Sequence, residues 1–417
     1  MSESGKMRKP ERDSYLSQRQ FRSWNSGALT FLVSLAVLAL GFGCKARESV
    51  TLQGSTMGTS YSIKLRNLPP EQDAAELKKA IDELLHETDY RFSSWQQDEL
   101  YKVNNHPVGS ELQISPDFCL VLYKSQLVWK SSEGEFDPTI GDLINLWGFG
   151  PEENQGKPGD AQIKAALAQA GFQNLKLSLP GGGPGSTGEY QKEIQSISDL
   201  YSLTSVNSLP NASQPEDSPS NQDAKAGCSL IRSTDLNLNL SAIAKGHGVD
   251  RVAQLLRKKG LQDFMVEIGG EIKTGPGGAF RIGIERPNYD GTRSLYTVLE
   301  SRNNCIATSG NYRNFFEKDG KIYSHILDPN TGRPGLSRIQ SATVVGPDCA
   351  LADALATAAM ILDPESSARM LNAIHESTGE KYEFLILESG ELIQGDTENF
   401  KIEEYTSSGL SDIRIQK

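Results

Sequence analysis

Residues 341–362 read SATVVGPDCALADALATAAMIL, a β-strand pattern, a turn and a helix in direct succession. A Gly-Pro-Asp turn ends the strand, and Ala and Leu dominate the helix that follows. Two polar side chains interrupt this helix, Asp353 and Thr357, and their separation by one helical turn places both on one face. A carboxylate and a hydroxyl in this arrangement can bind a hard cation through oxygen. The alternative interpretation is a solvated helix face with a local Asp–Thr contact.

The rest of the chain has the same mixed character. Alternating apolar residues predict strands, and apolar spacing near 3.6 residues predicts helices. The helix in residues 234–260 is expected to begin near Gly246, and Ser115 is the expected cap of another. We therefore predict one mixed α/β catalytic domain in two parts, residues 45–177 and 229–417. Its expected strands lie in residues 49–65, 263–275, 279–287, 295–310, 323–329 and 382–394, and its other helices in residues 71–90, 115–134 and 163–171.

Residues 178–228 separate these two parts. They are rich in Gly, Pro, Ser, Asn and Gln, so they bury little apolar surface. A loop of this length is unusual inside a compact domain. We predict a disordered insertion on the surface of the fold.

The first 44 residues read as an export signal. A basic, polar segment precedes the apolar run ALTFLVSLAVLALGFGC, which ends at Cys44. A cysteine directly after Gly43 resembles a bacterial lipoprotein signal, so Cys44 is the predicted lipidation site, although Gly41 stands where such signals usually carry Leu. The alternative is an uncleaved N-terminal anchor. Both place the domain outside the cytoplasm. We expect a lipid-anchored protein on the periplasmic face of a bacterial membrane, the cell inner membrane.

Charge and cysteine usage restrict the function further. The chain has 42 Lys and Arg against 53 Asp and Glu, a net charge of −11, which argues against nucleic-acid binding. The four cysteines after Cys44 form no CxxC pair, so a zinc site is not expected. Cys119 and Cys349 read as small core residues, and the sequence does not decide whether any cysteines form a disulfide.

Three stretches have the composition of ligand-binding turns. Lys245 is expected near a helix N-terminus, where free N–H groups and an ammonium favour an anion. Gly269 and Gly270 follow a strand and allow close approach of a ligand to the backbone. Trp95 lies in a polar segment after a helix, where an aromatic ring can stack on a flat ligand. Each stretch alone also fits an ordinary turn or surface residue.

Residues 324–334, SHILDPNTGRP, place His325 before an Asp-Pro and Thr-Gly turn. Histidine is suited to proton transfer near neutral pH. We predict that His325 is a general base held by this turn. The alternatives are a purely structural residue or one that orients a target.

Eight motifs, taken together and in order, resemble the ApbE family, the FAD:protein FMN transferases. The resemblance extends from about Gly54 to the C-terminal hairpin and is interrupted by the insertion. It implies an ApbE-like, T-fold-related α/β domain that uses FAD as substrate and Mg²⁺ as cofactor. The motifs are GSTMGTSYSIKL, FSSWQQDELYKVN, FDPTIGDLINLWGFGP, NLSAIAKGHGVD, EIGGEI, ATSGNYRNFF, SHILDPNTGRP and ADALATA.

The resemblance also implies a reaction and a partner. FMN moves from FAD to a Thr or Ser hydroxyl of a target flavoprotein, a subunit of a membrane redox complex outside the cytoplasm, and AMP leaves. His325 matches the candidate catalytic residue, and the metal is expected at Asp353, Thr357 and the carbonyl of Ala242. The residues that match FAD-binding positions are Met57, Trp95, Glu135, Phe136, Asp137, Asn239, Lys245 and Ile306.

One of these positions departs from the family pattern. Asn239 stands where the family usually has Asp, so hydrogen bonding is kept but a charge is lost. Cofactor affinity or preference could shift as a result. Two other functions remain as alternatives: an FAD pyrophosphatase that yields FMN and AMP, and a non-catalytic flavin-binding lipoprotein.

Overall fold

The computed structural model describes residues 49–151, 157–179, 228–289, 292–312, 315–318, 321–335, 338–389 and 401–416. The predicted signal segment and all of the predicted insertion except its first two residues and its last lie outside the described residues. Among the residues that the structure describes, no helix has the length and apolar character needed to cross a membrane.

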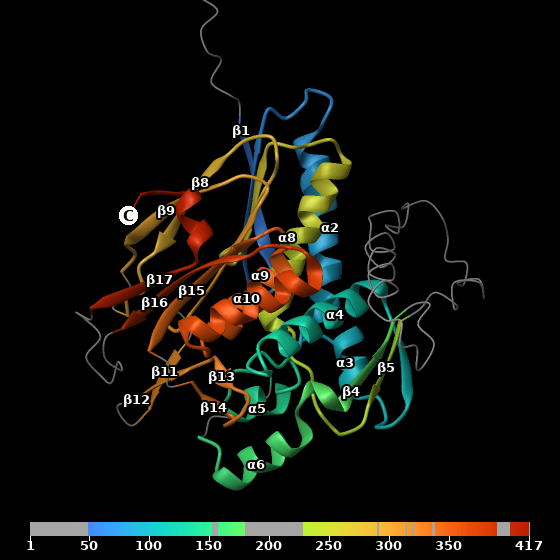
Figure 1. Ribbon diagram of the computed structural model, residues 1–417. Helices are drawn as coiled ribbons and strands as arrows, with labels where there is room; N and C mark the ends of the chain where they lie inside the picture. The colour runs from blue at the N-terminus through green and yellow to red at the C-terminus, as the bar shows by residue number, and fades with distance from the viewer. Residues whose placement is uncertain are drawn as a thin grey trace, which may run out of the picture. The chain divides into compact units, whose positions relative to one another are not determined.

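An eight-stranded antiparallel sheet is the centre of the fold (Figure 1). Each strand pairs only with its neighbours in this sheet, and the pairing is antiparallel throughout. In spatial order the strands are β1 (Ser49–Thr56), β2 (Thr59–Arg66), β6 (Phe264–Ile268), β7 (Glu271–Thr274), β10 (Cys305–Gly310), β15 (Ile339–Gly346), β16 (Glu383–Ser389) and β17 (Ile402–Thr406).

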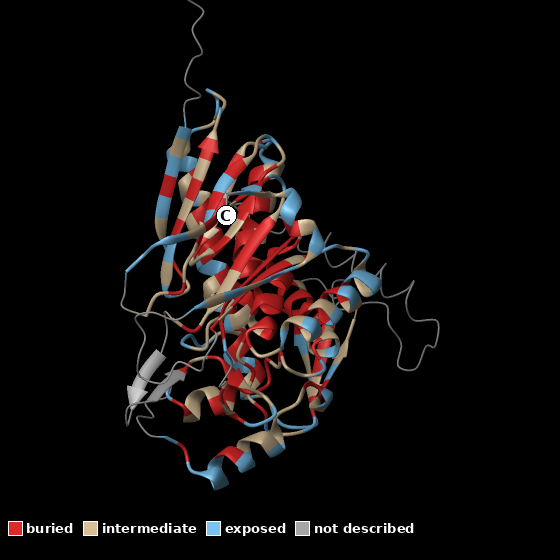
Figure 2. Ribbon diagram, turned by 60° about the vertical axis from the view of Figure 1, so that its left-hand side comes forward, coloured by how far each residue is buried: buried red, intermediate tan, exposed pale blue. Residues whose placement is uncertain are grey.

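Helices cover one face of the sheet and a smaller sheet covers the other. Because side chains alternate along a strand, β10 sends Ala307 to the core under the helices and Ile306 to the core under the smaller sheet. Figure 2 shows the buried residues concentrated in these layers. The helices are α2 (Ala74–Phe92), α3 (Glu99–Asn104), α4 (Pro116–Ser131), α5 (Gly141–Leu146), α6 (Asp160–Gln169), α8 (Ser241–Lys258), α9 (Cys349–Ala359) and α10 (Pro364–Thr378).

The remaining strands form short sheets around this centre. The layer opposite the helices is β8 (Phe280–Glu285), β9 (Leu295–Ser301) and β18 (Arg414–Gln416). A second three-stranded sheet contains β3 (Glu111–Ile114), β4 (Leu175–Ser178) and β5 (Cys228–Arg232). Two pairs complete the set: β11 (Phe315–Lys318) with β12 (Lys321–Ser324), and β13 (Leu327–Asp328) with β14 (Arg333–Pro334).

The mixed α/β prediction is confirmed, and so is the cap at Ser115, whose hydroxyl accepts a hydrogen bond from the Phe118 amide. The start of the helix in residues 234–260 was predicted wrongly, because α8 begins at Ser241, five residues before the expected Gly246. The strand expected before Gly269 and Gly270 is β6, and these glycines, with positive φ angles of 61° and 112°, reverse the chain into β7.

The structure also settles the cysteine pairing that the sequence left open. Cys119 in α4 is bonded to Cys228 in β5, with Cα atoms 6.0 Å apart. Cys305, the first residue of β10, is bonded to Cys349, the first residue of α9, with Cα atoms 5.2 Å apart. The second disulfide therefore fixes the start of the helix that carries Asp353 and Thr357.

Candidate active site

A cavity of about 700 Å³ lies where α8, α9, β7, β10 and the His325 turn meet. It is lined by every residue that the sequence and the family resemblance singled out for cofactor, metal or catalysis, apart from Met57 and Trp95. These residues come from parts of the chain as distant as Glu135 and Thr357. The fold therefore brings the predicted residues together although nothing in the spacing of the motifs required it.

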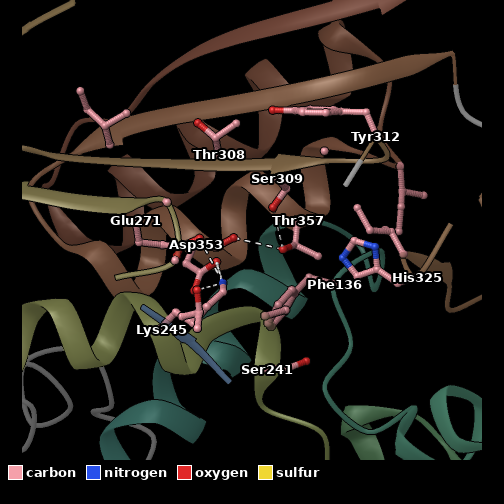
Figure 3. Close-up of a pocket in the computed structure, with 18 of the residues that line it drawn as sticks. Phe136, Ser241, Lys245, Glu271, Thr308, Ser309, Tyr312, His325, Asp353 and Thr357 are labelled. Atoms are coloured by element: carbon pink, nitrogen blue, oxygen red, sulfur yellow. Dashed lines mark hydrogen bonds and ion pairs between the residues drawn. The ribbon is translucent and has the colours of Figure 1, made fainter. Parts of the chain in front are cut away.

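Lys245 lies between two buried carboxylates on one side of the cavity (Figure 3). Its Nζ is 3.0 Å from Oε1 of Glu271 and 3.3 Å from Oδ1 of Asp353. The amide of Gly246 donates to Oδ2 of Asp353 at 3.0 Å. Two carboxylates thus face one ammonium, which leaves an excess negative charge when both are ionised.

Burial shifts the titration of this cluster. Burial raises the pKa of Glu271 to about 8, helped by nearby Asp353 and opposed by Lys245. For Lys245, burial opposes the charged form, but Asp353 and Glu271 outweigh it and raise the pKa of the amine. Oε2 of Glu271 is buried without a hydrogen-bond partner. The cluster accordingly keeps a fixed cation and one carboxyl group that gains a proton easily.

Thr357 lies one turn beyond Asp353 on α9, as predicted. Its hydroxyl is 3.2 Å from the Ser309 hydroxyl and donates to the Asp353 carbonyl at 3.2 Å. Ala242, in the first turn of α8, lines the same cavity. A Thr hydroxyl, a carboxylate and a backbone carbonyl are oxygen donors of the kind that Mg²⁺ accepts, and the buried Oε2 of Glu271, which has no hydrogen-bond partner, is a further oxygen on the cavity wall.

The donor set is sparse. Among the described residues, no group of three or more His, Cys, Asp or Glu side chains is arranged to hold a metal ion. A cation bound only by the Asp353 carboxylate, the Thr357 hydroxyl and the Ala242 carbonyl would keep positions open for phosphate oxygens or water. This fits Mg²⁺ better than a cation that needs a full protein cage.

The N-terminus of α9 is held rigidly. Oδ2 of Asp250 accepts hydrogen bonds from the amides of Cys349 and Ala350 at 2.8 and 3.1 Å. Asp348 caps the helix and pairs with Lys124 at 2.5 Å. With the disulfide at Cys349, these contacts fix the position of Asp353 one turn further along.

His325 lines the cavity on the side away from Lys245, and Figure 3 shows its ring beside Phe136 and Thr357. The imidazole makes an edge contact with Phe149, with ring centroids 6.3 Å apart. The following turn is closed by Asp328, whose side chain accepts from the Asn330 and Thr331 amides at 2.8 and 3.2 Å. The predicted turn therefore exists and presents His325 to the cavity.

The Glu135–Asp137 segment lines the cavity near this turn. Oε1 of Glu135 accepts from the Asn330 side chain at 2.9 Å, while its Oε2 is buried without a partner. Burial raises the pKa of Glu135, and Asp328 adds to the rise. Burial also raises the pKa of Asp137, whose Oδ1 is engaged by the amide and hydroxyl of Thr139 at 2.8 and 2.6 Å. Asp137 thus shapes the chain locally.

Lys245 and Asn239 have local surroundings that the sequence did not predict. Because α8 begins at Ser241, Lys245 lies in its second turn and offers its ammonium to the cavity rather than a helix N-terminus. Oδ1 of Asn239 accepts from the Ser241 amide and hydroxyl at 3.0 and 2.6 Å. Asn239 therefore supports the start of α8 while it lines the cavity.

Met57 and Trp95 do not line the cavity. Met57 has a positive φ of 49° and packs its side chain toward Gly248 of α8, while its amide donates to Asp89. Trp95 is 70% exposed. The neighbours Thr59 and Ser60 line the cavity in place of Met57. The roles assigned to Met57 and Trp95 stay predictions.

Glu271 is the residue of the charged cluster that sequence reasoning missed. It directly follows Gly269-Gly270, and it is a charged residue at a buried position of a strand. In the motif EIGGEI the glycines predicted a turn that a ligand can approach, and the same motif places Glu271 directly after that turn. The acidic residue after the turn was the available signal.

Comparison with known proteins assigns this chain and its fold to one family. The model of the ApbE family matches residues 57–379. An FAD:protein FMN transferase of Vibrio cholerae is 36% identical over 350 residues, which cover 82% of this chain and 90% of the relative. One from Haemophilus influenzae is 31% identical, covering 82% and 88%.

Solved structures agree. The flavin transferase ApbE from Vibrio cholerae aligns with a TM-score of 0.65 at 30% identity, covering 88% of this chain and 99% of that one. The apo form of the Pseudomonas stutzeri flavinyl transferase ApbE aligns with a TM-score of 0.64 at 26% identity, covering 88% and 97%. The chain belongs to the ApbE family.

Proposed function

We propose that this protein transfers FMN from FAD to a Thr or Ser hydroxyl of a target flavoprotein in a magnesium-dependent reaction that releases AMP. FAD:protein FMN transferase activity follows from family membership and from relatives at 36% and 31% identity. One observation carries the mechanism: the charged cluster of Lys245 and Asp353 and the imidazole of His325 line the same cavity.

The reaction exchanges one phosphoester bond for another. The acceptor hydroxyl oxygen bonds to the FMN phosphorus, and the bond from that phosphorus to the bridging pyrophosphate oxygen breaks. AMP leaves with the bridging oxygen, and the FMN phosphate becomes a diester. The hydroxyl proton passes to His325, which in neutral form is a base of suitable strength near neutral pH.

The charged side of the cavity serves the pyrophosphate. Lys245 is held cationic by its two carboxylates, so it offers a fixed positive charge to a phosphate oxygen. The Asp353 and Thr357 side chains and the Ala242 carbonyl would hold Mg²⁺. When bound, this ion neutralises charge on the phosphate oxygens.

The remaining lining residues would position the dinucleotide. Phe136 and Ile306 offer apolar surface, and Glu135, Asp137 and Asn239 offer polar groups, all on the cavity wall. Met57 and Trp95, which do not line the cavity, are the other two residues proposed to bind FAD. Trp95 is exposed and could cover a flavin ring by stacking.

The proposed location is the periplasmic face of a bacterial membrane, with a lipid on Cys44 as anchor. Two disulfides in the described chain support an oxidising compartment. The proposed acceptor is a flavoprotein subunit of a membrane redox complex on that side. Lipidation is tested by the mass of the mature N-terminus and by its loss in Cys44→Ala.

The test of function uses the chain from residue 45 onward with FAD, Mg²⁺ and a flavoprotein domain that bears an acceptor threonine. We expect FMN mass on the threonine, equimolar AMP, and loss of both in EDTA. His325→Ala should lose the transfer, whereas the matched control His86→Ala, an exposed residue of α2, should keep it.

Other outcomes separate the alternatives. AMP without protein-bound FMN, across several acceptors, would identify an FAD pyrophosphatase. Tight FAD binding without AMP would exclude both enzymatic functions and leave the flavin-binding lipoprotein. Transfer that survives in His325→Ala would refute the general base while leaving the transferase intact.

A further inference from the structure

The turn that carries His325 is attached to the fold at its far end by one buried hydrogen bond. The indole N–H of Trp147 donates to the carbonyl oxygen of Gly332 at 2.8 Å. Trp147 is 3% exposed, so no water competes for that bond. Gly332 has a positive φ of 64°, and its own amide donates to the Asp328 carbonyl at 2.8 Å. The bond therefore fixes a turn whose local conformation is already closed.

Trp147 belongs to a small apolar core that is separate from the two larger ones. This core unites α5 and α6 with Leu327, which lies two residues after His325. Gly332 packs closely against this core, since an added Cβ there would lie 2.7 Å from Ile163 and 3.1 Å from Leu143. The members of this core are Ile140, Leu143, Trp147, Ile163 and Leu327.

The same segment reaches the imidazole itself. Phe149, two residues after Trp147, packs against this small core and makes the edge contact with the His325 ring. The turn is thus held at Leu327 by apolar packing, at Gly332 by the indole, and at the ring by Phe149. None of these supports comes from α8 or α9, which carry the charged cluster.

We propose that Trp147 is a positioning residue for catalysis, which acts through Gly332 to hold the His325 imidazole at the acceptor hydroxyl. This inference rests on the proposed function. Trp147 is buried in the small core and does not line the cavity, so its side chain is not offered to FAD or to the acceptor. Its effect should therefore appear in the chemical step and not in binding.

The test is Trp147→Phe, which keeps an aromatic ring in the small core and removes the N–H. A base misplaced by about 1 Å can lose on the order of 100-fold in rate, and loss of one tether should cost about tenfold in kcat for FMN transfer. The Kd for FAD and the KM for the acceptor should stay within about twofold. In the His325→Ala background the same substitution should leave the residual rate unchanged, because both changes act through one group.

Two further variants make the result decisive. Trp129→Phe is the matched control, the same chemical change in α4 and outside the cavity, and should keep full kcat. Thr331→Val removes an exposed hydroxyl that donates to Asp328 at 2.9 Å. It loosens the turn without touching the small core, so it should show the same loss in kcat even if Trp147→Phe does not fold.

Several outcomes would overturn the inference. These are an unchanged kcat in Trp147→Phe, weaker FAD binding that accounts for the whole loss, or an equal loss with and without His325. An unchanged kcat in Thr331→Val, with Trp147→Phe unfolded, would do so as well. If the wild-type protein forms no protein-bound FMN, the proposed function is overturned instead. The wild-type sample of the same assay measures this directly.

Discussion

Glu271 makes the stability of the metal-free protein depend on pH in a direction opposite to that of most carboxylates. Its pKa rises from 4.5 to about 8 in the folded state, because the side chain is buried beside Asp353. Between these values the folded protein holds a proton that the unfolded chain releases. The contribution of Glu271 to stability is therefore greatest below about pH 4.5, falls as pH rises toward 8, and is constant above it.

The size of this effect follows from the shift. At about 1.4 kcal/mol per pKa unit, the full rise corresponds to on the order of 5 kcal/mol of unfolding free energy, spread over the window. The side chain is 3% exposed, so solvent screening removes little of it. Glu271→Gln keeps the shape of the side chain and cannot ionise. The variant should lack this part of the pH dependence.

The assay is urea unfolding of wild type and Glu271→Gln at about pH 5 and about pH 8.5, in EDTA because a cation would lower the pKa of Glu271. The stability of Glu271→Gln relative to wild type should increase by several kcal/mol from the lower to the higher pH. Glu300→Gln, at an exposed position of β9, is the control and should follow wild type. A difference between wild type and Glu271→Gln that does not change with pH would refute the reasoning.

Three further predictions concern the supports of the site. Burial alone would raise the pKa of Asp117, but His247 and two arginines lower it to about 2. The lowered pKa of Asp117 contributes about 2 kcal/mol to the unfolding free energy above about pH 4, and this contribution is lost as pH falls toward 2. Asp117→Asn lacks it, so acid unfolding of this variant, followed by circular dichroism, should begin at a higher pH than in wild type. Replacing both Cys305 and Cys349 by Ala opens a link across 44 residues, and should lower the urea-measured stability by about 4 kcal/mol; a change below about 1 kcal/mol would contradict this. Gly246→Ala places a Cβ 2.1 Å from the Cys349 carbonyl oxygen, and should cost about 1–3 kcal/mol and weaken FAD binding in a fluorescence titration; binding as tight as in wild type would count against this packing contact.

The elements that could be predicted from sequence are those whose pattern is local. Apolar periodicity and a Ser cap located α4, and alternation around a Gly-rich turn located β1 and β2. The start of α8 was predicted too late because Gly246 and Gly248, which have low helix propensity, indicated a turn where the helix is already formed. The disulfide pairing could not be predicted from local patterns either, because Cys305 and Cys349 come together only through the order of strands in the sheet.

The site divides in the same way. Asp353 and Thr357 share a helix face, so their proximity followed from spacing alone. The resemblance of the motifs to the family predicted that Lys245 and His325 belong to the site. Their neighbours could not be predicted, because these come from strands and turns that meet only in the fold. Glu271 went unrecognised because its function depends on burial beside Lys245. The exposure of Trp95 could not be predicted from the sequence either, because it depends on how the chain packs around it.

The two halves of the proposed chemistry rest on separate mechanical supports. Asp353 is fixed through α9 by a disulfide and the Asp250 cap, whereas His325 is fixed by the small core around Trp147. Changes to the first support should alter FAD and cation binding, and changes to the second should alter proton transfer. Because distant residues without shared partners act additively, combining Gly246→Ala with Trp147→Phe should multiply their separate effects on kcat/KM. A combined effect much smaller than this product would show that the two supports move as one body.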